Sequence, residues 1–285
     1  MTDINFRTAR QDDAESLGKI VFDAFNKISK EHNFPPDFPS PLAGAELMRM
    51  MISRSHIYSV VAENGRILGS NFLWEGDEVA GVGPITVDPE VQDRSIGRMM
   101  MEEVIRRADS RGKISIRLVQ AAYHNRSLAL YTKLGFDPVE PLSCIAGPPP
   151  QIRIDGRSVR TMQGSDVDAA SKLCIAVHGI SRKNEIAEAA LTGSARVVEA
   201  DGRITGYFTQ LGFFGHAVAE TDDDLIALIG SGEEIQGTGF LLPTRNAKVL
   251  RACLDNGLRI VQPLTLMSRG FYSEPRGAFM PSILY

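Results

Sequence analysis

Two short segments contain residue types that could bind an anion and move a proton. The first, 92–98, places the small residues Ser95 and Gly97 between two arginines, just before a helical pattern. Because a helix N-terminus presents unpaired amides and partial positive charge, Arg94 and Arg98 are unfavourable there unless an anion is bound. Small residues also allow close backbone approach, so we predict a pyrophosphate-type anion at this turn. The alternative is an ordinary polar turn before a surface helix.

The second segment, 125–136, is typical of a helix with one apolar face. Leu128, Tyr131 and Leu134 fall on that face, and Gly135 would end the helix. Tyr131 could donate a proton during catalysis, or it could simply pack in the core with its hydroxyl satisfied. Asn125 could bind a ligand, cap the helix, or do both.

The elements around these segments alternate between strand and helix. The β-branched stretch Val79–Val87 reads as a strand, and Asn64-Gly65 predicts a tight hairpin. We expect strands at 4–7, 57–62, 66–74, 79–87 and 114–120 and from Phe136 onward, with helices at 12–28, 41–52 and from Ile96. This order predicts an α/β layered fold around a mixed central sheet flanked by helices.

The two segments together resemble the GNAT N-acetyltransferase superfamily. Its acetyl-CoA signature reads Gln or Arg, two residues, Gly, one residue, Gly or Ala, and Gln92, Ser95 and Gly97 match it, with serine in place of the first glycine. The segment 125–136 matches the Asn, Ala, Tyr and Gly-Phe helix of the family. The resemblance covers roughly residues 3 to 147.

The resemblance implies direct transfer of an acetyl group from acetyl-CoA, the co-substrate, to an amine, without a metal or a covalent intermediate. It implies that backbone groups of Ile85, Thr86 and Val87 hold the pantetheine arm and polarise the thioester carbonyl. Asn125 would bond the same arm, and Tyr131 would protonate the departing thiolate. The residues expected at the pyrophosphate are Gln92, Asp93, Arg94, Ser95, Ile96, Gly97 and Arg98.

The general base and the acceptor site are less strongly specified. Glu75, beside Trp74, is the candidate base, acting directly or through water, although a solvated charge beside a turn is the alternative. His56 and His124 are further candidates. In the family, the proline-rich loop 34–39 would form one wall of the acceptor site, and a structural cover is the alternative.

The chain contains an internal repeat. The block 61–69 recurs at 198–206, and the segment from Gly135 to Pro141 recurs from Gly257 to Pro263. The Gly-Pro-Pro-Pro run at 147–150 is the best linker candidate. We therefore predict an acetyl-CoA-binding domain at 1–147, a linker at 148–156 and a degenerate acetyltransferase-like domain at 157–285, giving two tandem domains.

The second copy lacks the features expected of a coenzyme site. Three aspartates, Asp222 to Asp224, stand where the first copy has its phosphate turn, and carboxylates there would satisfy the helix N-terminus and repel phosphate. Asn246 matches Asn125, but the helix that follows it has no tyrosine: it reads Val249-Leu250-Arg251-Ala252-Cys253-Leu254. We predict that the second copy does not bind CoA.

Composition favours an enzyme without a nucleic-acid or membrane partner. The formal net charge is −4, and no basic stripe is present to neutralise phosphates. No apolar run is long enough to span a bilayer, and residues 1–13 lack a signal-peptide core. The three cysteines, Cys144, Cys174 and Cys253, are scattered and odd in number, which favours reduced thiols in the cytoplasm over disulfides or a zinc site.

Two functional classes fit these observations. The first is an acetyl-CoA-dependent N-acetyltransferase that acts on a primary amine of a small molecule or peptide. The second is a non-catalytic acyl-CoA-binding sensor or scaffold module. The repeat could replace within one chain the dimer of single-domain relatives, so both a monomer and a homodimer are open.

Overall fold

The computed structural model describes residues 4–92 and 95–285, and the chain divides into two compact units. The first consists of Met1–Leu118 and Tyr123–Phe136, and the second of Val119–Ala122 and Asp137–Tyr285. Both units combine helices with sheet, so the predicted α/β class is confirmed. No helix or strand lies between residues 147 and 157, where the linker was expected. The domain limits at 147 and 157 remain a prediction about folding units.

The first unit is built on a mixed sheet. Its strands follow the order β1-β2-β3-β4-β6, in which β4 and β6 are parallel and the other pairs are antiparallel. Its elements are β1 (Asn5–Arg7), α1 (Ala14–Glu31), α2 (Pro41–Ser53), β2 (Ile57–Glu63), β3 (Ile67–Trp74), β4 (Val79–Val82), β5 (Thr86–Val87), α3 (Ile96–Ser110), β6 (Ser115–Ala121) and α4 (Asn125–Lys133), with short 3-10 turns at Gln11–Asp13 and Pro89–Val91.

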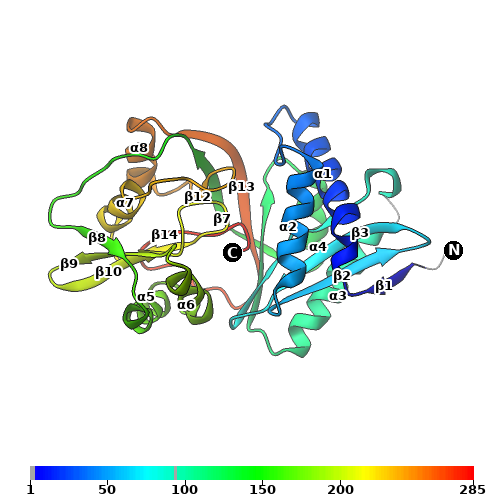
Figure 1. Cartoon of the computed structure of the whole chain (residues 1–285), viewed down its shortest axis with the longest axis horizontal. Helices are drawn as coiled ribbons and strands as arrows, with labels where there is room; N and C mark the ends of the chain where they lie inside the picture. The colour runs from blue at the N-terminus through cyan, green and yellow to red at the C-terminus, as the bar shows by residue number, and fades with distance from the viewer. Residues whose placement is uncertain (1–3, 93–94) are drawn as a thin grey trace. The chain divides into compact units, whose positions relative to one another are not determined.

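Alternation along β3 places helices on both faces of this sheet. Phe72 packs in a buried cluster with Leu17 of α1 and Met48 of α2, whereas the neighbouring Asn71 donates to the Met100 carbonyl of α3 at 3.4 Å. Figure 1 shows α1 and α2 side by side. A Cβ atom on Gly18 would lie 2.2 Å from the Ala45 nitrogen, so glycine allows these two helices to approach closely.

The predicted fourth strand is divided in two. β4 ends at Val82, and β5 resumes at Thr86 after three residues outside the ladder, so one continuous strand over 79–87 was wrong. Both pieces pair with β3: Trp74 lies opposite Gly81, and Ser70 lies opposite Thr86. The β-branched composition of this stretch predicts extended backbone but does not report the break.

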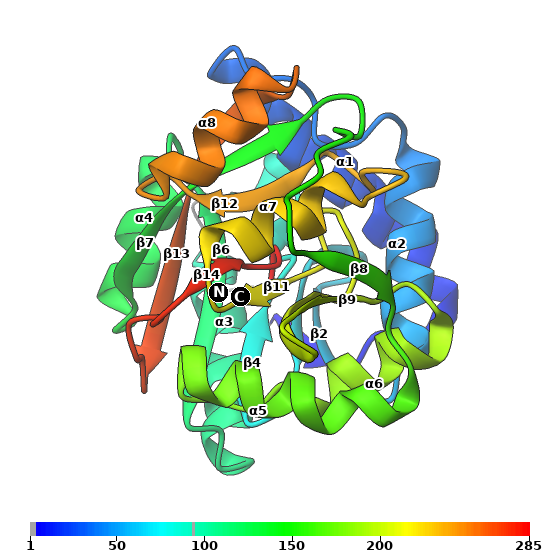
Figure 2. The same cartoon turned by 90° about the vertical axis from the view of Figure 1, so that its left-hand side faces the viewer.

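The second unit contains two sheets. One is five-stranded and antiparallel, in the order β14-β11-β10-β9-β8, and β7 pairs with both β12 and β13 in the other. Figure 2 shows β14 beside β11, with α7 nearby. The elements are β7 (Asp137–Ala146), β8 (Ser158–Thr161), α5 (Val167–His178), α6 (Lys183–Thr192), β9 (Arg196–Ala200), β10 (Arg203–Phe208), β11 (Ala217–Ala219), α7 (Asp222–Gly230), β12 (Phe240–Pro243), α8 (Ala247–Asp255), β13 (Arg259–Gly270) and β14 (Ala278–Met280), with a 3-10 turn at Gly164–Asp166.

An ion-pair triad occurs in both units. In the first, Arg7 binds Asp13 at 2.6 Å and Glu63 at 2.7 Å. In the second, Arg160 binds Asp166 and Glu199 at the same two distances. The sequence analysis did not identify either triad. Each one ties a first strand to the start of a first helix, which supports a structural repeat.

The triads also correct the alignment of the repeats by one residue. Arg7 lies opposite Val61 and Arg160 lies opposite Val197, so Glu199 corresponds to Glu63. The ungapped comparison had matched Glu63 with Ala200. The ladders of both hairpins shift register near the turn, which absorbs the extra residue of the second hairpin.

Candidate functional site

The outer edge of β5 is the first component of the site. β5 pairs with β3 through Gly69 opposite Val87 and Ser70 opposite Thr86, and the Asp88 amide continues the pairing to the Leu68 carbonyl at 2.8 Å. Within the described ranges, no second strand is recorded beside β5. Thr86 is buried and Ile85 and Val87 are partly buried. The edge can therefore supply backbone groups to a ligand that lies along it.

The N-terminus of α3 is the second component. Ser95 precedes the helix in a left-handed conformation, with φ at 61°, and its side chain makes no capping hydrogen bond. The first turn contains no acidic residue. The amides of Ile96, Gly97 and Arg98, the first three helical residues, have no acceptor within α3 itself. This arrangement leaves the positive end of the helix dipole available to an anion.

Space beside this turn comes from Gly97. A Cβ atom there would meet Val87 Cγ2 at 3.7 Å and Leu130 Cδ2 at 4.0 Å, which are ordinary contacts. Gly97 also joins the two components, since the same added atom would touch β5 and α4. Arg98 is partly buried, with 43% of its side chain exposed, and pairs with Glu102 at 3.4 Å, one turn along α3. Such a surface pair is weak, so Arg98 can turn to an anion at low cost.

The residues before the turn are held in place by the protein itself. Asp88 accepts from the Glu90 amide at 2.9 Å and pairs with Arg66. Burial would raise the pKa of Asp88, but the hydrogen bonds from Arg66 and Glu90 lower it overall. Gln92 is partly buried, and its amide group lies 3.5 Å from the Val87 carbonyl. The predicted ligand contacts Asp93 and Arg94 lie outside the described residues.

The helix α4 carries the proposed acid. Tyr131 is 7% exposed and packs edge-on against Phe136 with 6.3 Å between ring centroids. Burial raises the pKa of its hydroxyl, so the group stays protonated at neutral pH. Among the described residues, burial alone shifts this pKa, and no hydrogen bond contributes to the shift. Asn125 is exposed and is the first residue of α4, whereas the N-cap is His124.

Glu75 is held in an ion pair. Its two carboxylate oxygens accept from Arg107 on α3 at 2.6 and 3.1 Å, and its backbone oxygen accepts from Lys113 at 2.7 Å. A base must accept a proton from the substrate, and Arg107 occupies both oxygens that could do so. Glu75 therefore forms a structural ion pair within the first unit.

The loop after α1 is an ordered aromatic surface. Phe34 stacks on Tyr123 with 4.1 Å between ring centroids, and Asn26 holds the backbone of Phe38 through two hydrogen bonds of 2.8 and 3.1 Å. Ser29 donates to Asp37 at 2.7 Å. The sequence analysis did not single out Tyr123, although an aromatic residue two positions before Asn125 was a signal. The loop thus packs beside the start of α4.

His124 follows Tyr123 and lies between this aromatic surface and α4. It is partly buried, and burial, together with His32 and Arg126, lowers its pKa below the usual 6.5. His124 is therefore neutral at pH 7 and can accept a proton. His56, the other candidate, lies 6.0 Å from the Trp74 ring.

The corresponding helix start in the second unit is capped by its own side chains. Thr221 and Asp224 form a reciprocal capping box at the N-terminus of α7. Asp224 also accepts from Thr205 at 2.8 Å and from Arg157 at 2.5 Å. These contacts satisfy the helix end without a ligand.

The start of α8 corrects another expected correspondence. The Asn246 side chain accepts from the Val249 amide at 3.2 Å and donates to Asp222 at 2.8 Å. As an N-cap it corresponds to His124 and not to Asn125. At the C-terminal ends of α4 and α8, the backbone carbonyls of Tyr131 and Cys253 accept from the amide of the residue after the helix-ending glycine. A buried cysteine therefore stands in α8 where α4 has its tyrosine.

The described residues contain neither a membrane-spanning helix nor a metal-binding cluster. None of their helices combines the length and apolar composition needed to cross a membrane. Among the same residues, no cluster of three or more His, Cys, Asp or Glu side chains is placed to hold a metal ion.

Comparisons with known proteins agree with this architecture. Several solved structures cover nearly the whole chain. A crystal structure of a Pyrococcus horikoshii protein covers 100% of this chain and 94% of its own, with a TM-score of 0.72 and 17% identity. A tandem GNAT protein from the clavulanic acid biosynthesis pathway covers 94% and 98%, with a TM-score of 0.54 and 13% identity. At these identities the likeness shows the fold, which is that of tandem GNAT proteins.

Sequence comparison relates one segment of the chain to a known family. Residues 23–136 match the model of the Acetyltransferase (GNAT) family, so this segment is similar to that family. A 53-residue stretch is 40% identical to the [ribosomal protein bS18]-alanine N-acetyltransferase of Salmonella typhimurium. This alignment covers 19% of the chain and 36% of that relative, so the chain spans about a third of the relative's length. The predicted family and tandem fold are confirmed.

Proposed function

We propose that the chain is an N-acetyltransferase that binds acetyl-CoA in its first unit and transfers the acetyl group to a primary amine. The observation that supports this proposal is that two features lie together in the first unit: an edge of β5 beside which the described residues place no second strand, and an α3 N-terminus that the Ser95 side chain does not cap. The match of residues 23–136 to an acetyltransferase family supports the same reaction.

The two components would bind different parts of the coenzyme. The amides of Ile96, Gly97 and Arg98 would donate to the pyrophosphate, and Gln92 and Ser95 flank it. Asp93 and Arg94 complete the proposed set. Backbone groups of Ile85 to Val87 would bind the pantetheine arm as an added strand, and one amide would polarise the thioester carbonyl. Asn125, whose side chain is exposed at the start of α4, would contact the same arm.

The chemical step would exchange one bond for another. The amine nitrogen attacks the thioester carbon, a C–N bond forms, the C–S bond breaks, and the electron pair leaves with sulfur. Tyr131 would donate its hydroxyl proton to the departing thiolate. Tyr131 is protonated at neutral pH, as a tyrosine of ordinary pKa also is, so the hydroxyl has a proton to donate.

The proton of the amine requires a separate acceptor. Glu75 is the base expected from the sequence, and it could act only after its ion pair with Arg107 opens. His124 is neutral, partly buried and adjacent to Asn125, so it meets the requirement without a rearrangement. We therefore propose His124 ahead of Glu75 as the base.

A pH profile separates these two bases. If His124 is the base, kcat/KM falls as the pH drops below its pKa, because the protonated ring cannot accept a proton. His124→Gln removes this acid limb, whereas Glu75→Gln with Arg107→Gln keeps it. An unchanged acid limb in His124→Gln contradicts the assignment.

The acceptor is a small-molecule or peptide amine. The Salmonella typhimurium relative is named for an alanine of a ribosomal protein, which supports a peptide amine, and the ordered Phe34–Tyr123 surface could contact either kind. A screen for thiol release from acetyl-CoA should include amino acids, polyamines, aminoglycosides and peptide N-termini. Release with one class supports the enzyme. CoA binding without release from any amine supports the sensor, and absence of CoA binding contradicts both.

A further inference from the structure

The second unit has its own counterpart of the β5 edge. β10 pairs with β11 through Gly206 opposite Ala219 and Tyr207 opposite Val218, and the Glu220 amide donates to the Thr205 carbonyl at 2.8 Å. This repeats the pairing of Gly69 with Val87 and of the Asp88 amide with Leu68. β11 is therefore the equivalent of β5.

The outer edge of β11 is occupied by the chain itself. β14 pairs with it antiparallel, with Ala217 opposite Met280, Val218 opposite Phe279 and Ala219 opposite Ala278. Phe279 and Met280 are 4% and 1% exposed, and the Phe279 ring packs edge-on against His178. The backbone groups proposed to hold a coenzyme in the first unit thus bind a peptide strand in the second.

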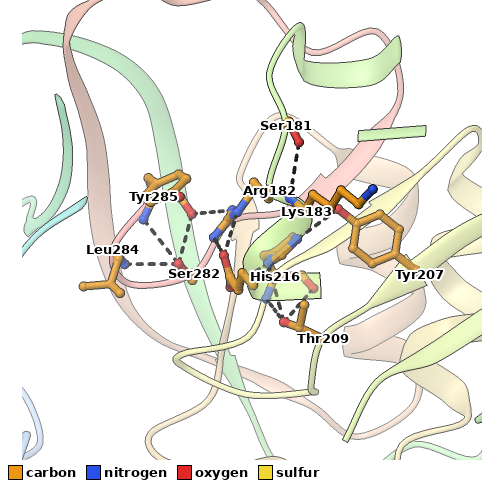
Figure 3. Close-up of polar contacts among 10 residues, drawn as sticks. Ser181, Arg182, Lys183, Tyr207, Thr209, His216, Ser282, Leu284 and Tyr285 are labelled. Atoms are coloured by element: carbon orange, nitrogen blue, oxygen red, sulfur yellow. Dashed lines mark hydrogen bonds and ion pairs between the residues drawn. The ribbon is translucent and has the colours of Figure 1, made fainter. Parts of the chain in front are cut away.

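The residues after β14 are fastened by a buried polar network (Figure 3). Arg182 donates to the Tyr285 backbone oxygen at 3.0 Å and stacks over the Tyr285 ring at 4.0 Å. Ser282 donates to the same oxygen at 3.0 Å, and the Ile283 amide donates to Phe213 at 2.8 Å. Ser282, Leu284 and Tyr285 are all buried. The second unit therefore holds this segment through contacts to both its backbone and its side chains.

Arg182 is held in position by a chain of hydrogen bonds within the second unit. Glu185 accepts from Arg182 at 2.9 Å and lies 2.9 Å from His216 Nδ1, and His216 Nε2 lies 2.9 Å from the Tyr207 hydroxyl. Burial would raise the pKa of Glu185, but Arg182 and His216 outweigh it and bring the pKa to about 2. Burial and Arg182 lower the pKa of His216, so it is a neutral ring that donates to Glu185 and accepts from Tyr207.

We propose that the outer edge of β11 is a peptide-binding site, filled in cis by residues 276–285 as an internal ligand. The comparison with a coenzyme rests on the proposed function, since it takes β5 as the pantetheine edge. The site accepts an extended apolar strand followed by an aromatic residue that stacks on Arg182. Its counterpart in the first unit is left open for the coenzyme.

Peptide exchange tests this proposal in the whole chain. A protease cleavage sequence is inserted after Glu274, and the protein is cut after folding. We expect residues 276–285 to remain bound through gel filtration and to exchange with an excess of a labelled synthetic peptide of the same sequence, at one peptide per chain. Immediate loss of the segment without any change in the melting temperature overturns the proposal.

Changes confined to the synthetic peptide avoid any effect on folding. Tyr285→Ala in the peptide should weaken binding about 10-fold, because the ring over Arg182 is lost. Phe279→Asp should abolish binding, because it places an unpaired charge in an apolar contact. Equal binding of all three peptides overturns the proposal. CoA binding is measured on the same cut protein: its absence together with specific peptide exchange contradicts the proposed function and leaves this site intact.

Discussion

The helices α3 and α7 occupy equivalent places in the two repeats, but their N-termini are satisfied in opposite ways. α7 begins with a Thr221–Asp224 capping box and three acidic residues, whereas α3 begins after an uncapped Ser95 without an acidic residue in its first turn. A capped end needs no ligand, and its carboxylates repel phosphate. One fold can thus keep or close an anion site through a few residues at one turn.

The outer edges of the strands β5 and β11 also differ between the two repeats. β14 covers the outer edge of β11, and no strand is recorded on the outer edge of β5 within 4–92 and 95–285. Among the described residues, nothing covers either half of the proposed coenzyme site in the first repeat, whereas both equivalent places are filled in the second. The two changes reinforce each other, since each alone would remove one part of the binding energy.

The largest expected effect concerns the tyrosine that the second repeat lacks. Tyr131→Phe should lower kcat about 100-fold or more with little change in KM for acetyl-CoA, because a general acid acts in the chemical step. Steady-state kinetics with the acceptor found in the screen measures this. The control is Tyr58→Phe, which removes a hydroxyl bonded to Glu103 in the same unit. Unchanged turnover in Tyr131→Phe would remove the proposed acid.

A second variant introduces into the first turn of α3 a negative charge like those in the first turn of α7. Gly97→Asp places a carboxylate in the first turn of α3 and should weaken CoA binding about 50-fold, because charge-assisted hydrogen bonds to the pyrophosphate are replaced by repulsion. Calorimetry measures the affinity.

Two control variants separate charge from size. The added methyl group of Gly97→Ala meets protein atoms at 3.7 and 4.0 Å, which are ordinary contacts. We expect this variant to lose less CoA affinity than Gly97→Asp, and its loss measures only the crowding of the ligand. Gly164→Asp adds the same charge to the second unit, at a position where an added Cβ meets no atom within 4 Å. Equal CoA affinity in Gly97→Asp and Gly164→Asp would contradict the placement of the site.

A third change tests the triads that the repeats share. Arg7→Met should cost about 2 kcal/mol in free energy of unfolding and Arg160→Met about 1 kcal/mol, because the Arg7 side chain is 19% exposed and the Arg160 side chain is 37% exposed. Chemical denaturation measures both. A larger loss in Arg160→Met would show that exposure does not rank the two triads.

Local patterns made much of this fold predictable. The hairpin at Asn64-Gly65 and the helix stop at Gly135 follow from residues that favour positive φ, and both glycines have it, at 67° and 86°. The helical spacing after Ile96 likewise predicted α3. These features depend on neighbours in sequence, which is why the sequence reports them.

Features that depend on distant partners were missed. The break between β4 and β5 reflects how each piece pairs with β3, and the pairing of β14 with β11 joins residues about sixty positions apart in sequence. The Glu75–Arg107 pair is equally invisible in the sequence, although it decides whether Glu75 is available as a base. The Arg-to-Asp spacing of six residues in both repeats was a usable signal.

The most direct test of the central claim is the stoichiometry of coenzyme binding. Titration of the intact chain with CoA in a calorimeter should give one site per chain, and that site should be lost or strongly weakened in Gly97→Asp. Two equivalent sites per chain, or one site that Gly97→Asp leaves untouched, would contradict the assignment of coenzyme binding to the first repeat.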